Sequence, residues 1–359
     1  MPALRLPPRL GRRPLIAAVA AVLVGSTGAA PVSAHGNVDV GPPDLPGLLF
    51  GWTWEPSVTL ALVVAAVGWL AAVRRVNRAH PGNPVPRFRT AAWMAGLATL
   101  AIALLSGIAR YDTTLFWVHM IQHILLTLVA PPLLALAAPI TLLLRLSGPA
   151  TRRRWILPVL HSRVVRVLAF PVVAWVVFAG VMWASHFSPV FDLALEDPLV
   201  HELEHAAYLG AGLLFWWPAV AADPGPWRMS HPARAMYVFM QMPQNTFLAV
   251  ALLSAPAPLY EHYVTLVRPW GPSPLEDQQT AAGIMWFVGD LLFLVPIMVI
   301  VAAWMRHEEG RTAHNDRQAD RARLAIRERE VALAERRTRE TAIAAEPAQP
   351  GSGAASNSR

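Results

Sequence analysis

The sequence predicts an all-α polytopic membrane protein: a bundle of seven transmembrane helices with its N-terminus outside and its C-terminus in the cytoplasm. Of the 359 residues, 55% are hydrophobic and only 15% are charged, whereas about one quarter of a soluble domain is charged. Seven apolar stretches follow one another, each close to the ~20 residues that cross a hydrocarbon core. Arginines occupy alternate connections between them, which is a topology signal.

The remaining composition excludes several classes of protein. All the basic charge behind the net +7 is arginine, because the chain contains no lysine. These arginines are not interleaved with aromatic residues, as a nucleic-acid-binding surface requires, so we expect no nucleic-acid partner. The absence of cysteine excludes disulfides and thiolate sites, and any metal must be held by histidine, methionine or carboxylate.

The N-terminal residues 1–34 are predicted to be a signal peptide. Four arginines precede the apolar run 15–24, and Val32-Ser33-Ala34 forms a cleavage site of the small-x-small type. An uncleaved first helix is the alternative. Residues 35–56 are then an external N-terminal segment, followed by the seven-helix membrane domain at 57–305.

The predicted spans are too long for strands, and the glycines and prolines inside them are tolerated in membrane helices. Pro131 and Pro132 should kink the third span, and the apolar run that continues to Leu144 is a re-entrant or slanted extension. In chain order the spans are 57–73, 91–109, 115–137, 167–185, 200–221, 235–255 and 280–304.

The connections set the orientation. Segments 74–90 and 145–166 are rich in arginine, whereas the opposite side offers only Arg110 and Arg268 in the mature protein. The positive-inside rule therefore places the mature N-terminus outside and the C-terminus in the cytoplasm, and seven spans give the same parity. We expect a multi-pass protein of a bacterial plasma membrane.

The C-terminal tail differs from the membrane domain. Residues 306–345 consist largely of Arg, Glu and Ala, which favours a charged cytoplasmic helix. Such a helix is either simply solvated or in contact with anionic lipid or a partner. Residues 346–359 are rich in Gly, Ser, Pro and Ala and are expected to be disordered.

Two histidine pairs lie near the outer ends of the third and fifth spans. The segments His119-Met-Ile-Gln-His123 and His201-Glu-Leu-Glu-His205 share a four-residue spacing, which puts both rings of a pair on one helix face. Because ionisable groups inside a bilayer are costly, they mark function more often than in a soluble helix. The pairs either bind a metal together or merely hydrogen-bond to one another, to Asp112 or to Glu204.

Softer ligands are expected beside these pairs. Met182 precedes His186 at the outer end of the fourth span, and Met285 lies near the start of the seventh. Imidazole and thioether together suit copper, and Cu(I) in particular, although each methionine alone is equally consistent with packing. If the signal is cleaved after Ala34, the amine and imidazole of His35 form a further copper ligand pair.

Two polar features remain. Acidic residues gather in the outer connections, where they either attract cations or are simply what positive-inside topology leaves there. Asp290 lies within the seventh span and needs a partner or a cavity, and the segment Met240–Asn245 is either an ion relay or a kink. No nucleophile motif, phosphate-binding loop or dinucleotide fingerprint is present, so we do not expect an enzyme.

Three motifs, in order, resemble the CtaG family, the multi-spanning cytochrome c oxidase assembly factors of the Bacillus type. The resemblance covers about residues 45–305 and excludes the signal segment and the tail. The motifs are His119-Met-Ile-Gln-His123 before Ala130-Pro-Pro-Leu, Val200-His-Glu-Leu-Glu-His205 before Leu214-Phe-Trp-Trp-Pro218, and Asp277-Gln-Gln-Thr-Ala-Ala-Gly-Ile-Met-Trp286.

The resemblance implies a role in maturing a haem–copper oxidase, by delivering copper to its subunits or holding it for them. The expected partners are those subunits, a copper chaperone outside the cytoplasm, and the lipid bilayer. The motif residues carried over by position are His119, His123, His201, Glu204, His205, Asp277 and Met285. Together with Met182, His186 and His35, they are the predicted metal ligands.

Two other functions remain open at the level of sequence. Histidines on facing helices can ligate haem axially, which would make the protein a membrane electron carrier. Alternatively, the chain is an assembly scaffold that recruits oxidase subunits and binds no metal.

Overall fold

The structure is a computed structural model that describes residues 41–344. These residues form helices joined by turns and short connections, with no strand among them, so the predicted all-α class is confirmed. The predicted signal peptide at 1–34, the predicted ligand His35 and the segment 346–359 lie outside the described residues.

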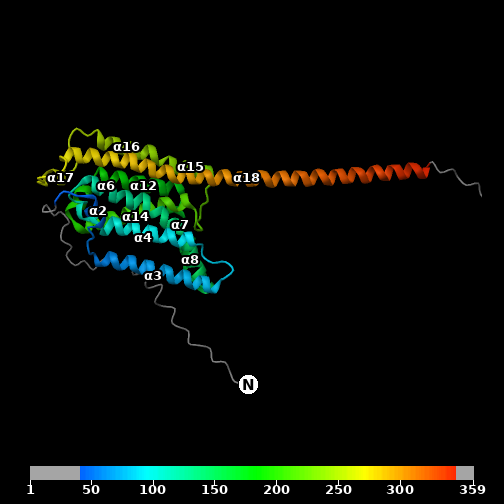
Figure 1. Ribbon diagram of the computed structural model, residues 1–359, viewed down its shortest axis with the longest axis horizontal. Coiled ribbons are helices and arrows are strands. Elements are labelled where there is room, and N and C mark those ends of the chain that lie inside the picture. Colours follow the sequence, from blue (N-terminus) through cyan, green and yellow to red (C-terminus); the bar gives the residue numbers. More distant parts are fainter. Residues whose placement is uncertain (1–40, 345–359) are drawn as a thin grey trace, which may run out of the picture. The chain divides into compact units, whose positions relative to one another are not determined.

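Most of the longer helices run alongside one another (Figure 1). Several begin with a proline in the first turn, where its missing N–H has no intrahelical partner to lose. The elements are α2 Leu45–Phe50, α3 Pro56–Ala79, α4 Arg87–Leu105, α5 Gly107–Tyr111, α6 Phe116–Ile124, η1 Leu125–Val129, α7 Ala130–Ala137, α8 Pro139–Leu146, α9 Pro149–Thr151, η2 Arg152–Ile156, α10 Leu157–Leu160, α11 Arg163–Leu168, α12 Pro171–His186, α13 Val190–Glu196, α14 Pro198–Val220, α15 His231–Phe239, α16 Gln241–Leu253, α17 Glu261–Thr265 and α18 Pro274–Ala344.

Fewer spans than predicted are evident from helix length and composition. Among residues 41–344, four helical segments are long and apolar enough to cross a bilayer, or five if α12 and α13, which meet at a 70° bend, are one span. The four are Pro56–Ala79, Arg87–Tyr111, Phe116–Leu146 and part of α18, Pro274–Thr341. The count of seven remains a prediction.

Two predicted spans are not among these for identifiable reasons. Helix α14 has sufficient length, but its first two turns carry two histidines and two glutamates, which lower its hydropathy. The sixth predicted span is broken into α15 and α16 at Met240. Pro243 explains the break, because it has no N–H to donate to the carbonyl of Phe239 one turn earlier.

The third predicted span is irregular where its two prolines lie. A π-helical turn, η1, separates α6 from α7, and such turns are frequent at functional sites. Because Pro131 lacks an N–H, the carbonyl of Thr127 loses its usual helical donor. The indole Nε1 of Trp216 on α14 donates to that carbonyl instead, at 3.0 Å. The irregular turn is thereby tied to α14.

Close approach of α14 to η1 requires a small residue at one position. A Cβ added to Gly212 would lie 2.9 Å from the carbonyl oxygen of Thr127 and 2.7 Å from Cγ of Pro131. By contrast, Gly210 faces open space, with no atom within 4 Å of such a Cβ. Gly212 therefore sets the distance between the two helices that carry the predicted histidine pairs.

Several helices present apolar side chains outward. On α3, Leu60, Val63 and Val67 are each more than half exposed. In water such a stripe would be unfavourable over a whole helix, whereas lipid chains accommodate it. The fold therefore suits a lipid environment.

Helix α18 belongs to two units, which divide between Val301 and Ala302. Within the first, Asp290 accepts hydrogen bonds from Asn245 Nδ2 at 3.2 Å and Thr246 Oγ1 at 3.0 Å on α16, so this embedded carboxylate has the partners that its position requires. In the second unit, the described side chains are almost all exposed. Its pairs Glu308–Arg311 and Asp320–Arg323 follow helical spacing.

Candidate metal site

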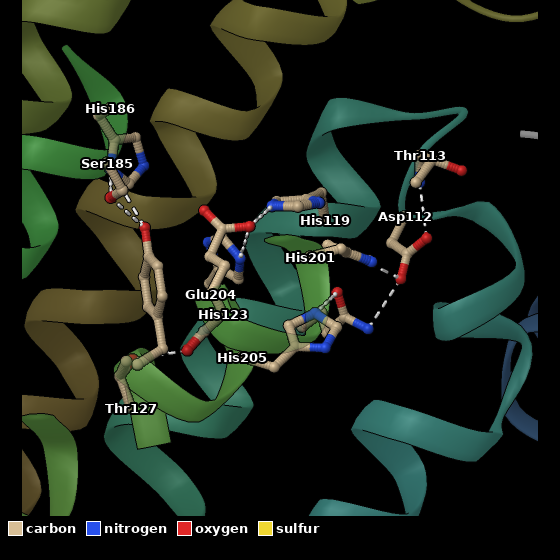
Figure 2. A network of polar contacts seen from close by, with 12 residues as sticks. Asp112, Thr113, His119, His123, Thr127, Ser185, His186, His201, Glu204 and His205 are labelled. Atoms are coloured by element: carbon tan, nitrogen blue, oxygen red, sulfur yellow. Dashed lines mark hydrogen bonds and ion pairs between the residues drawn. The ribbon is translucent and has the colours of Figure 1, made fainter. Parts of the chain in front are cut away.

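The site is built mainly by α6 and α14, with the end of α12 beside them (Figure 2). Helix α14 begins at Pro198, and the carboxylate of Asp197 caps it by accepting from the N–H groups of Leu199 and Val200. This cap fixes the turn from which His201 and Glu204 point inward.

The start of α6 is fixed by a residue distant in sequence. Asp277 accepts hydrogen bonds from the backbone N–H groups of Phe116 at 3.1 Å and Trp117 at 3.0 Å, and Arg268 lies 3.4 Å from the same carboxylate. Both oxygens are thus engaged in capping α6. Asp277 was predicted to be a metal ligand, but the structure does not bring it into the imidazole cluster and gives it this capping role.

The two histidine pairs face each other, and each pair occupies one helix face, as its spacing predicted. Within each pair the ring centres are 4.0 Å apart for His119–His123 and 4.2 Å apart for His201–His205. Between the helices, His119 and His201 are 5.6 Å apart, and His123 and His205 are 6.3 Å apart. The cluster therefore presents four imidazoles within a few ångströms.

Glu204 lies between the two rings of α6 (Figure 2). Its Oε2 is 3.7 Å from Nε2 of His119 and 3.7 Å from Nε2 of His123. All three side chains are buried, and neither oxygen of Glu204 nor any ring nitrogen of the two histidines has a hydrogen-bond partner. Buried polar groups are nearly always hydrogen-bonded, so this concentration of exceptions requires an explanation. A bound cation would engage the carboxylate of Glu204 and one nitrogen of each imidazole.

A second carboxylate stands on the other side of His201. Oδ2 of Asp112 lies 3.9 Å from its Nε2 and accepts from Nε2 of Gln122 at 2.9 Å. Gln122 also donates to the carbonyl of Ala103, at 3.0 Å. Because both partners only accept, the amide oxygen of Gln122 must face His205, whose Nε2 is 3.0 Å away and donates.

Two overlapping groups have ligand atoms within 4.8 Å of one another. One comprises His119, His201 and Glu204, and the other comprises Asp112, His201 and His205. Imidazole with carboxylate suits zinc, copper, iron or nickel. The donor sets therefore fit a transition-metal ion, with His201 common to both.

The predicted sulfur ligands lie on the opposite side of His123. A cavity of about 30 Å³ is lined by His123, His186, Met182 and Met285, among others, which is room for a single small species. His186 lies 6.5 Å from His123 between ring centres, and its buried Nε2 has no hydrogen-bond partner. The two methionines thus line a cavity with His123 and His186, and neither Glu204 nor Asp112 lines that cavity.

Nδ1 of His186 is held by its surroundings. It lies 2.8 Å from the carbonyl of Met182 and 3.2 Å from Oγ of Ser185. Tyr208 stacks on His123 at 3.9 Å between ring centres, and its hydroxyl lies 2.5 Å from Oγ of Ser185. Because these contacts occupy Nδ1, Nε2 is the ring nitrogen of His186 that remains available to a ligand.

The histidine of α17 has a structural role. Nε2 of His262, on α17, contacts the carbonyl of Thr113 at 2.8 Å. The neighbouring Tyr263 donates its hydroxyl to the carbonyl of Asp112 at 2.9 Å. Burial raises the pKa of Tyr263 well above its usual value, so the hydroxyl remains a donor. Helix α17 thus holds the connection that positions Asp112.

Sequence reasoning missed part of this network. Asp112 was considered as a hydrogen-bonding partner and as one of the outer acidic residues, and Gln122, Ser185 and Tyr208 were not singled out. Tyr208 follows Glu204 by four residues and so shares its helix face, which is a usable signal. Gln122 lies between the two histidines of its motif but acts toward α14 through a tertiary contact that spacing does not reveal.

Comparison with known proteins gives three relatives. Uncharacterised proteins of Mycobacterium bovis and Mycobacterium tuberculosis are each 32% identical to this chain over 286 residues, and one of Mycobacterium leprae is 31% identical over the same length. Each alignment covers 78% of this chain and 43% of the relative, so the chain spans less than half the length of these relatives. No solved structure matches.

A family match covers most of the chain that the structure describes. Residues 67–307 match the family described as cytochrome c oxidase caa3 assembly factor. The matched segment contains α6, α12 and α14, and with them every residue of the imidazole cluster. The chain therefore belongs to the cytochrome c oxidase caa3 assembly factor (Caa3_CtaG) family.

Proposed function

We propose that this protein serves the assembly of a haem–copper oxidase by binding copper in the buried cluster and passing it to an oxidase subunit. The ion is cargo, and the protein performs no chemical transformation. The single observation that carries the proposal is the set formed by His119, His123 and Glu204, whose six buried side-chain nitrogen and oxygen atoms lack hydrogen-bond partners. Such a set is unfavourable when empty and favourable around a cation.

Copper is favoured over other transition metals by what borders the imidazoles. Met182 and Met285 line the small cavity that His123 and His186 share, and thioether with imidazole suits Cu(I). The family is described by its part in cytochrome c oxidase assembly, and copper is a component of such oxidases. An extracytoplasmic copper chaperone is the proposed donor.

The proposal places the cluster in the outer half of a bacterial plasma membrane. The arginine-rich connections around residues 74–90 and 145–166 belong on the cytoplasmic side. With seven spans, α14 and the broken pair α15–α16 cross the membrane despite their lower hydropathy. His119 then lies within about 10 Å of the outer boundary at 1.5 Å per helical residue.

Haem is a weaker candidate for this cluster. Axial ligation needs two imidazoles that bind the iron from opposite faces of the porphyrin. The two rings must therefore be far enough apart for the porphyrin to fit between them. Here the ring centre of His119 lies 4.0 Å from that of His123 and 5.1 Å from that of Phe191, so the rings are packed together. An absorption spectrum of purified protein without a Soret band removes the haem hypothesis.

Metal analysis tests the proposal. The full-length protein is purified from membranes without chelator, and its copper is measured for the native chain, His119→Ala and Glu204→Gln. His80→Ala is the matched control, because His80 is exposed at the end of α3. We expect stoichiometric copper in the native chain and control, and loss in the other two. Equally negligible copper in all four chains would favour the metal-free scaffold.

A further inference from the structure

A cavity of about 210 Å³ leads from the surface to the cluster. It lies between the start of α3, the end of α4 and the first turns of α14. The residues with polar groups most relevant to a cation are Glu55, Asp112, Gln122, His201, Glu202 and His205.

The lining of this cavity changes with depth. Glu202 is exposed and Glu55 is half-buried, whereas Asp112 and His201 are only 1% and 5% exposed. His119 is fully buried, and neither it nor Glu204 lines the cavity. A cation arriving from outside would therefore meet carboxylates first, then Asp112, His201 and His205, and the buried pair last.

His201 connects the cavity to the buried set. Its Nε2 is buried without a hydrogen-bond partner, although the residue lines the cavity. The same side chain belongs to the outer group with Asp112 and His205 and to the inner group with His119 and Glu204. Any ion moving between the two groups can keep one protein ligand throughout.

We propose that Asp112, His201 and His205 form an entrance site for a transition-metal cation, from which His201 hands the ion to the inner set of His119 and Glu204. This inference rests on the proposed function and adds the path by which that site is loaded. The transfer exchanges coordinate bonds only, with no electron transfer: Asp112 and His205 leave the ion as Glu204 and His119 join it.

Charge supports this order of events. Each group contains one carboxylate, so the cation has a negative partner before and after the transfer and is never bare in the low-dielectric interior. The carboxylates at the mouth raise the local cation concentration and hence the rate of capture. Gln122 orients both outer ligands, since it donates to Asp112 and accepts from His205.

The kinetics of copper uptake test the entrance site. Cu(I) is supplied as its complex with a chromophoric chelator, and loading of the purified full-length protein is followed by the loss of chelator absorbance. Release is followed after addition of excess chelator. The variants are Glu202→Gln at the mouth and His205→Gln in the entrance site. Glu196→Gln is the matched control, being an exposed glutamate that does not line the cavity.

If the entrance site lies on the route of the ion, both loading and release should slow by the same factor in each variant. We expect a factor of about tenfold for His205→Gln and a few-fold for Glu202→Gln. The control should match the native chain. Native uptake with unchanged rates in both variants would overturn the entrance site alone. Loss of retained copper in His205→Gln without slower loading would also overturn it, by making His205 a ligand of the final site. No uptake by the native chain would instead reject the proposed function.

Discussion

Oε2 of Glu204 lies 3.7 Å from Nε2 of His119, and neither atom has a hydrogen-bond partner although both residues are buried. Leaving a buried polar atom unpaired costs about 1–3 kcal/mol, and more for a charged group. The arrangement therefore lowers the stability of the metal-free protein and gains stability when a cation binds. That trade-off links the fold to the proposed function.

The first prediction concerns Glu204. Replacing it by leucine removes a buried carboxylate that has no hydrogen-bond partner, so the metal-free variant should be more stable than the native chain by about 1–3 kcal/mol. Addition of copper should raise the melting temperature of the native chain in detergent but not that of Glu204→Leu. A less stable metal-free variant, or an equal copper-induced shift in both chains, would contradict the account of this carboxylate.

The second prediction separates capping from metal binding at Asp277. Asp277→Asn weakens the acceptors of the Phe116 and Trp117 N–H groups, and loss of such a cap costs about 1 kcal/mol. The melting temperature of the variant should fall, while Glu196→Gln, at an exposed position away from α6, should leave it unchanged. Unaltered stability together with complete loss of copper would instead restore Asp277 as a ligand.

The third prediction concerns the distance between α6–η1 and α14. Gly212→Ala places a methyl group against the backbone of Thr127 and should destabilise the protein by about 1–3 kcal/mol through overpacking. Gly210→Ala has open space around the new methyl and should be neutral or slightly stabilising. The difference in melting temperature between the two single-methyl variants measures the effect. Equal melting temperatures would show that the helices do not meet at Gly212.

The fourth prediction concerns topology, and the cysteine-free chain makes it simple to test. Single cysteines are introduced at exposed positions, Glu196→Cys for the proposed outer side and Arg153→Cys for the cytoplasmic side. A membrane-impermeant maleimide applied to intact cells should label the first, and should label the second only after the cells are opened. The reverse pattern would invert the proposed orientation.

The helical period was sufficient to predict the central feature of the site. Spacing alone placed His119 with His123 and His201 with His205 on single helix faces, and the structure brings these faces together. Hydropathy alone was less informative for α14, because the residues that build the site lower the apolar signal of the helix that carries them.

The remainder of the site depends on contacts between distant residues, which no local pattern encodes. Asp277 caps α6 across 161 residues of chain, and its position in the third motif gave no sign of this role, so it was predicted to be a ligand. The orientation of Gln122 depends on Ala103 and Asp112, and its contact with His205 spans 83 residues. The spacing of residues along a helix does not reveal tertiary hydrogen bonds of this kind.

Copper X-ray absorption spectroscopy of the purified, copper-loaded chain tests whether the buried imidazoles bind the metal. We expect nitrogen and oxygen scatterers in the first shell of the metal, with the outer-shell features of more than one imidazole. These imidazole features should weaken in His119→Ala and persist in the His80→Ala control. A spectrum without imidazole scattering, or one identical in the native chain and His119→Ala, would show that the buried cluster is not where copper binds.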